Sequence, residues 1–308
     1  MTAFRNPIGD GQDPWVTFYN GYYYLVQSRS HKIIFIKKAS RLQDVLAAEE
    51  NIVWEAPDNT NYSFETWAPE LHSIDGKWYI YFASDDGKNE NHRMFVIEGD
   101  GEDPICNYNL KGQLTNAQSI DGTILEMGNR ERYFIWSGAP VGVNPQHLYI
   151  SKMTNPWTLE GEVVEISKPE YEWEKSAAWV NEGPTVLKRN GKVHLVYSAS
   201  ACFGEYCYGL LTLTGDNPLD INSWTKHPEP VFSGTETVWG PGHGNFTVSP
   251  DGKEDWMVYH AKKVNGFTFD RQLCIQKYTW NEDDTPNFGR PVPLHADIEE
   301  PSGQDNNL

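Results

Sequence analysis

The stretch "EGPTVLKRNGKVHLVYSAS" at residues 182–200 shows the unit from which most of the chain is built. It begins with a carboxylate, continues with a short β-prone run, turns at "NG", and ends in a second apolar run. An Asn-Gly pair between two β-prone runs is a strong signal for two short antiparallel strands. The stretch therefore predicts a β-hairpin with Glu182 at the head of its first strand.

The same order of features occurs in four other segments. In each, a polar turn with Gly or Asn follows the head residue after seven to nine residues, and a second apolar run follows the turn. The heads recur at intervals of 53–62 residues, which leaves room for two more strands per interval. The four segments are "DPWVTFYNGYYYLVQS" (13–28), "APELHSIDGKWYIYFAS" (68–84), "DGTILEMGNRERYFIWSG" (121–138) and "GNFTVSPDGKEDWMVYHAK" (244–262).

Four strands per unit, repeated five times, predict an all-β fold: a five-bladed β-propeller with four antiparallel strands per blade. We expect one propeller domain over residues 1–297 and a loose tail over 298–308. The only short helical candidate is 41–50. The alternative fold is a β-sandwich with coincidental turns. Candidates for further strands are 31–39, 93–99, 146–153, 208–215 and 271–280.

Composition narrows the class of partner. The chain has 308 residues, of which 39% are hydrophobic and 13% aromatic, so it can bury a substantial core. Its formal net charge of −18 argues against nucleic acid, whose binding usually needs a basic face. No apolar run approaches the ~20 residues that span a bilayer. A neutral polymer against which aromatic rings can stack, such as carbohydrate, fits this composition.

The sequence says less about the cellular location of the protein and about the state of its cysteines. The N-terminus lacks the basic start and apolar core of a signal peptide, which predicts a cytoplasmic protein or one trimmed of a leader. The four cysteines match no zinc-site spacing. Cys202 and Cys207 in "CFGEYC" can close a small disulfide, although free buried thiols explain them equally well.

The propeller geometry brings the heads together. If the first strand of every unit is innermost and all run the same way, the head residues form a ring at one mouth of the channel. Three carboxylates then converge there, and like charges at close range raise one another's pKa. A structural ring would avoid this, whereas a catalytic pocket uses it. The ring contains Asp13, Ala68, Asp121, Glu182 and Gly244, with His243 one residue before the last.

Converging carboxylates suit the hydrolysis of a glycosidic bond. That reaction needs an acid for the leaving oxygen and a second carboxylate as base or nucleophile. A third can keep the acid protonated. Trp15 and Trp67 stand beside heads and can stack on a sugar, although tryptophan in a β-protein is more often core. "DG" at 121–122 and "EGP" at 182–184 also read as simple turns.

The motifs "GQDPWV", "TWAPEL", "SIDGT", "NEGPTVLKRNGKVHLVYSA" and "GPGHGNFTVSPDG" resemble the serial motifs of glycoside hydrolase family 43. The resemblance extends from about residue 6 to residue 295. It implies a five-bladed propeller and an inverting mechanism. By motif, Asp13 would be the general base, Glu182 the general acid, and Asp121 the residue that tunes and positions the acid.

Two further residues gain a role from the resemblance. His243 in "GPGH" corresponds to a channel histidine that, in many members, helps to hold a hydrated calcium or other ion. Since Ca²⁺ prefers oxygen ligands, water would supply most of its shell. Arg271 resembles the family arginine that lies against the bound sugar, and its alternative reading is a solvent-facing strand residue.

The resemblance leaves the sugar open among arabinofuranosides, arabinans and xylosides. The β-xylosidases it resembles often carry a C-terminal β-sandwich, whereas this sequence ends as the fifth blade closes. The aromatic segment 168–184 is expected to wall off one end of the groove. Both features favour an exo-acting α-L-arabinofuranosidase that acts on arabinose-containing oligo- or polysaccharide.

The alternatives are a β-xylosidase or an endo-arabinanase of the same family, acting on xylose- or arabinose-containing substrates. A non-catalytic carbohydrate-binding propeller would not need acids at three heads. An invertase-like enzyme would place its nucleophilic carboxylate in a different motif setting.

Overall fold

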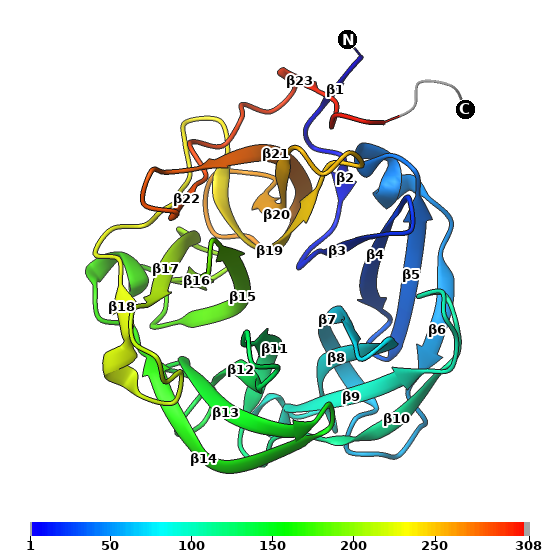
Figure 1. Cartoon of the computed structure of the whole chain (residues 1–308), viewed down its shortest axis with the longest axis vertical. Coiled ribbons are helices and arrows are strands. Elements are labelled where there is room, and N and C mark those ends of the chain that lie inside the picture. Colours follow the sequence, from blue (N-terminus) through cyan, green and yellow to red (C-terminus); the bar gives the residue numbers. More distant parts are fainter. Residues whose placement is uncertain (1, 305–308) are drawn as a thin grey trace.

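The computed structural model describes residues 2–304, and over these residues it forms five antiparallel β-sheets arranged radially about one axis (Figure 1). In each blade the chain starts at the innermost strand and proceeds outward. The predicted five-bladed propeller is confirmed. The five segments predicted as further strands form the third strand of every blade, because each follows its hairpin directly and pairs with the hairpin's second strand.

The strands follow the order of the chain. Blade 1 contains β3 (Trp15–Tyr19), β4 (Tyr22–Arg29), β5 (Ile33–Ala39) and β6 (Asn51–Glu55). Blade 2 contains β7 (Phe64–Ile74), β8 (Lys77–Asp85), β9 (Arg93–Gly99) and β10 (Tyr108–Gln113). Blade 3 contains β11 (Ser119–Glu126), β12 (Arg132–Gly138), β13 (His147–Asn155) and β14 (Thr158–Ser167).

The last two blades complete the ring. Blade 4 contains β15 (Asn181–Arg189), β16 (Lys192–Ala199), β17 (Cys207–Leu213) and β18 (Trp224–Lys226). Blade 5 contains β19 (Trp239–Val248), β20 (Asp255–Lys262), β21 (Arg271–Trp280), the N-terminal β2 (Gly9–Asp10) and the short β22 (Pro286–Asn287).

The two ends of the chain lock the ring. Strand β2 pairs with β21, so the N-terminus supplies the outer strand of the last blade. Strand β1 (Ala3–Arg5) pairs with β23 (Asp297–Glu299), and this pair lies at the outer edge of the ring (Figure 1). The structure differs here from a loose tail beginning at residue 298. Ser302 also hydrogen-bonds to Asp251, whereas residues 305–308 lie outside the described part of the chain.

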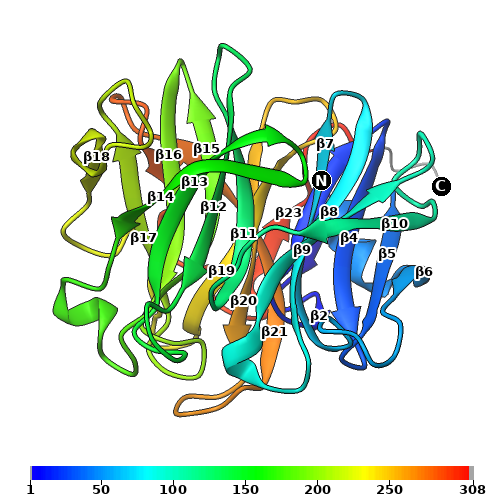
Figure 2. The same cartoon turned by 90° about the horizontal axis from the view of Figure 1, so that it is seen from below.

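Apolar side chains packed between neighbouring blades form the core. Val26 of β4 and Ile80 of β8 are fully buried in one cluster between blades 1 and 2. Fully burying such a side chain contributes about 1.5–3 kcal/mol. The second strand of each blade is covered on both faces by its neighbours, which explains why β8 is buried along nearly its whole length. Seen from the side, the blades stand as a thick ring (Figure 2).

Helical structure within residues 2–304 is limited to short 3₁₀ turns. The predicted helical segment 41–50 contains η1 (Leu42–Ala47), which is a 3₁₀ turn. No helix in residues 2–304 is long and apolar enough to cross a membrane. The remaining 3₁₀ turns are η2 (Asn89–Asn91), η3 (Glu172–Glu174) and η4 (Ile221–Ser223).

Candidate active site

The innermost strands share a backbone irregularity near their first residues. The register of β7, β11, β15 and β19 with the second strand of the blade shifts there. Such a β-bulge bends a strand and re-aims a side chain. Non-glycine residues rarely adopt a positive φ, and this conformation is often stored at functional sites. One positive-φ residue occupies a comparable position near the start of each innermost strand, just before β3 in blade 1: Asp13 (46°), Ala68 (43°), Asp121 (55°), Gly183 (54°) and His243 (33°).

These residues correct the alignment of the heads in blades 4 and 5. The alignment of the five repeated segments with one another makes Glu182 equivalent to Asp13 and Asp121, but Gly183 has the matching backbone conformation. Glu182 lies one residue earlier and pairs with β16 before the register shifts. In blade 5 the matching residue is His243, one before the predicted head. The sequence repeat could not show this because a bulge adds a residue without changing the hydrophobic pattern.

A cavity of about 230 Å³ opens where the innermost strands begin. Many of its side chains come from two consecutive backbone positions, the positive-φ residue and the residue before it. Loops of blades 4 and 5 complete the wall. The lining residues are Gln12, Asp13, Trp67, Ile120, Asp121, Glu182, Cys202, His243, Phe269 and Arg271. The structure thus brings together six of the seven residues that the sequence singled out.

Trp15 is the seventh residue, and the structure does not place it in the cavity lining. Its indole nitrogen donates to the carbonyl oxygen of Leu71 at 2.9 Å, and its ring packs against His72. Trp15 therefore lies in the interface between blades 1 and 2. Of the segment 168–184, predicted to wall the groove, only Glu182 is among the lining residues.

Asp13 is surrounded by positively charged or hydrogen-bonding groups. Its Oδ1 lies 3.0 Å from an Arg271 guanidinium nitrogen, 3.1 Å from Nδ1 of His260 and 3.3 Å from Nδ1 of His243. Burial disfavours the carboxylate, but the charges of Arg271 and His243, together with the His260 contact, outweigh burial and hold the pKa of Asp13 well below its usual range. Asp13 is therefore ionised at any ordinary pH.

Glu182 is held in the opposite state. Burial, and then the nearby charge of Asp121, raise the pKa of Glu182 from 4.5 to about 7. Tyr206 donates a 2.8 Å hydrogen bond from its hydroxyl to Oε1 of Glu182, which partly offsets the rise. Near neutral pH, Glu182 can therefore hold a proton and release it, as a general acid must.

Asp121 couples the other two carboxyl groups electrostatically, because its pKa is raised by Asp13 and its own charge raises the pKa of Glu182. Burial and the charge of Asp13 raise its pKa from 3.8 to about 7, while the backbone N–H of Gly183 donates to its Oδ2 at 3.1 Å and favours the ionised form. Its Oδ2 also lies 3.9 Å from Nδ1 of His243. Asp121 can thus modulate the proton affinity of Glu182 while the Gly183 backbone holds it in place.

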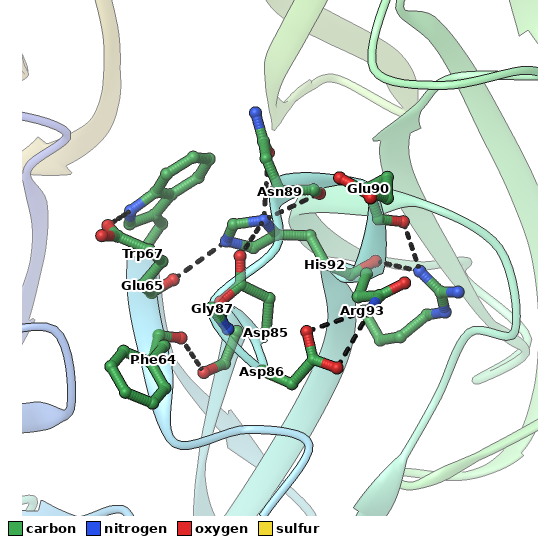
Figure 3. Close-up of polar contacts among 12 residues, drawn as sticks. Phe64, Glu65, Trp67, Asp85, Asp86, Gly87, Asn89, Glu90, His92 and Arg93 are labelled. Carbon is green, nitrogen blue, oxygen red and sulfur yellow. Dashed lines mark hydrogen bonds and ion pairs between the residues drawn. The ribbon is translucent and has the colours of Figure 1, made fainter.

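The Trp67 side chain, which lines the cavity, is held in place by contacts with Glu65 and His92. The Trp67 indole nitrogen donates to Glu65 at 2.9 Å, and its ring stacks on His92 with centroids 4.0 Å apart (Figure 3). His92 in turn contacts the Glu65 carbonyl at 3.0 Å and the buried Asp85 carboxylate at 3.1 Å. These contacts hold the Trp67 side chain as a fixed aromatic surface.

The sequence analysis missed Tyr206 and His260, which contact the acid and the base. Their rings stack on each other with centroids 5.4 Å apart and nearly parallel planes. Tyr206 stands inside "CFGEYC", a pattern that indicates at most a disulfide, and both Cys202 and Cys207 are free. The position of His260 gives a usable signal, because "YHA" lies where β20 returns to the channel mouth beside His243.

The arrangement around His243 bears on the predicted cation. Within residues 2–304 no group of three or more His, Cys, Asp or Glu side chains is placed to hold a metal ion. Nδ1 of His243 is directed instead at the carboxylates of Asp13 and Asp121. These donors do not form a protein-ligated calcium site, since Ca²⁺ takes six to eight oxygen ligands. A cation in the channel stays a prediction, with water as its main ligand.

Two of the known proteins to which the chain is similar carry the same name. An extracellular exo-α-(1→5)-L-arabinofuranosidase from Streptomyces avermitilis is 38% identical over 94% of this chain and 64% of its own length. One from Streptomyces chartreusis is 40% identical over 79% of this chain and 76% of its own. The chain thus spans about two thirds of the length of the first of these relatives. Neither name supports the expected cytoplasmic location, since both proteins are called extracellular.

A solved structure and a family model complete the comparison. The crystal structure of an α-L-arabinofuranosidase from Lactobacillus brevis superposes with a TM-score of 0.88 at 38% identity. It covers 95% of this chain and 98% of the other. The model of "Glycosyl hydrolases family 43" matches residues 4–286. The propeller, the carboxylates at its mouth and these matches agree, and the chain belongs to glycosyl hydrolase family 43.

Proposed function

We propose that this protein is an inverting, exo-acting α-L-arabinofuranosidase that releases terminal arabinofuranose from arabinose-containing oligo- or polysaccharide. The observation that carries the proposal is the split of proton affinities in one cavity. The pKa of Asp13 is held below its usual range, and that of Glu182 is raised to about 7. Two carboxyl groups in one site whose pKa values are shifted in opposite directions identify the acid and the base of a reaction. The similar arabinofuranosidases support the choice of sugar.

In the proposed reaction Glu182 donates its proton to the glycosidic oxygen as the bond from that oxygen to the anomeric carbon breaks. Asp13 accepts a proton from a water molecule, whose oxygen forms the new bond to the anomeric carbon on the opposite face. When it is ionised, Asp121 favours the protonated form of Glu182 through its negative charge. Arg271 and His243 hold the Asp13 carboxylate toward the cavity.

The size of the cavity supports exo action. Ligand pockets usually have ~300–1,000 Å³, and this one has about 230 Å³. One terminal sugar suits such a volume better than the interior of a polysaccharide chain. Trp67 offers an apolar face to the ring, and the polar groups opposite it are available for hydroxyl contacts.

A panel of aryl glycosides tests the sugar. Release of the aryl group from the α-L-arabinofuranoside, with little from the β-D-xyloside, is expected. Preferential hydrolysis of the xyloside would refute the arabinofuranosidase proposal. Linear α-1,5-arabinan gives the second arm, because exo action releases only arabinose, whereas early oligosaccharide products would refute it.

A further inference from the structure

Two phenylalanine side chains at the edge of the cavity are unusually exposed. Phe267 and Phe269 expose 78% and 66% of their surface, more than any other aromatic residue in the described chain. Val264 on the same loop is 52% exposed. Burial of an apolar side chain stabilises a fold by roughly 1.5–3 kcal/mol, and these residues forgo most of that gain. Their exposure is therefore better explained by a ligand than by stability.

The two rings belong to an ordered cluster. Phe203 lies against both, with ring centroids 5.8 Å from Phe267 and 5.1 Å from Phe269. The backbone N–H of Thr268 donates to the carbonyl of Phe203 at 3.2 Å, which ties the β20–β21 loop to the β16–β17 loop. The aromatic cluster (Phe203, Phe267 and Phe269) is therefore held by two loops from adjacent blades.

The cluster is continuous with the catalytic cavity. Phe269 is itself a lining residue, and Cys202, the neighbour of Phe203, is another. Two residues after Phe269, Arg271 contacts Asp13 and also donates from its Nε to the Phe269 carbonyl at 3.3 Å. A sugar that extends out of the cavity past these residues meets the aromatic cluster directly.

The position of the general acid indicates which sugar of the substrate would contact the aromatic cluster. The β16–β17 loop that carries Phe203 also carries Tyr206, whose hydroxyl hydrogen-bonds to Glu182. Glu182 must face the glycosidic oxygen, because it protonates the leaving group. The leaving group therefore departs along the side of the cavity where this loop lies.

We infer that the aromatic cluster is a binding surface for the leaving-group sugar, the residue that follows the scissile bond. The inference rests on the proposed glycosidase function. Aromatic faces bind the C–H faces of neutral sugars through apolar contact, and they add affinity without competing for the charges that Asp13 and Glu182 need. The cluster thus favours oligosaccharides over substrates that lack a second sugar.

The test compares two substrates in the single variant Phe267→Ala, because Phe267 belongs to the aromatic cluster but is not among the residues that line the cavity. α-1,5-Arabinotriose has a sugar leaving group, whereas α-L-arabinofuranosyl fluoride has none. For Phe267→Ala, kcat/KM on arabinotriose should fall about tenfold, the scale of one lost aromatic contact, and kcat/KM on the fluoride should stay within about twofold. Tyr22→Ala, which removes an exposed ring from the first residue of β4, is the matched control and should leave both values unchanged.

Equal losses on both substrates would mean that the variant disturbed Arg271 and would overturn the inference, as would no loss on either. A wild-type protein that hydrolyses neither substrate would refute the proposed function itself. Binding gives a second readout. In the Asp13→Asn background, Phe267→Ala should weaken affinity for arabinotriose but not for arabinose. If the wild type is instead a dimer that Phe267→Ala converts to monomer, the cluster is a subunit interface and the inference fails.

Discussion

Replacing Asp121 by asparagine should shift the pH dependence of activity without destroying the site. Asparagine keeps the shape and a carbonyl oxygen that can still accept the Gly183 N–H, which donates to Asp121 at 3.1 Å. It removes the negative charge that disfavours ionised Glu182. The pKa of Glu182 should therefore fall, and the high-pH limb of kcat/KM should move to lower pH.

The size of the shift follows from the causes of the raised pKa. Glu182 moves from 4.5 to about 7, first through burial and then through the charge of Asp121. The charge of Asp121 accounts for only part of this rise, so the limb should move by less than the whole rise; each unit of movement corresponds to ~1.4 kcal/mol. No low-pH limb from Asp13 should appear in the assayed range for either protein, because the pKa of Asp13 lies well below its usual range and Asp13 stays ionised throughout.

The assay is kcat/KM for α-1,5-arabinobiose between about pH 4 and 9, since kcat/KM reports the free enzyme's acid and base. Tyr206→Phe is the matched control with the opposite sign. It removes the 2.8 Å hydrogen bond that lowers the pKa of Glu182, so the high-pH limb should move upward. If the limb stays in place or moves upward in Asp121→Asn, the assigned coupling between Asp121 and Glu182 is wrong.

Three further predictions address the other assignments. Glu182→Ala should lose about 10²–10⁴-fold on arabinobiose, and much less on aryl glycosides with very acidic leaving groups; equal losses would argue against Glu182 as the acid. Asp13→Asn should be nearly inactive, and proton NMR of the wild-type reaction should show an inverted first-formed sugar; a retained product would make Asp13 a nucleophile. If a hydrated cation sits beside His243, exhaustive chelation should lower activity or melting temperature and added Ca²⁺ should restore it, whereas unchanged values would remove the cation.

Local sequence was sufficient for the fold. The turn pair "NG" in residues 182–200 and its counterparts mark hairpins, and strand alternation is visible within ten residues. Because five similar units at a regular period can bury their sheets only against one another, the propeller followed from the repeat. The same local reading brought the carboxylates Asp13, Asp121 and Glu182 to one mouth.

The sequence could not show how the ring closes. Strand β2 has only two residues and pairs with β21, more than 260 residues away in the chain. The segment 297–299 likewise becomes a strand only because β1 lies beside it. Strands this short have no pattern of their own, since their stability comes from a partner that is distant in sequence.

The chemistry of the site was decided by the tertiary structure. Sequence named Glu182 as the acid only by resemblance, and a β-bulge that no repeat reveals sets it one residue before the position that Asp13 and Asp121 share. Its raised pKa depends on burial and on a charge from another blade, and Tyr206 reaches it from a neighbouring loop. The proton affinity of a carboxyl group is set by the sum of three effects: nearby charges, hydrogen bonds and the loss of hydration on burial. That sum exists only once the five blades enclose the cavity.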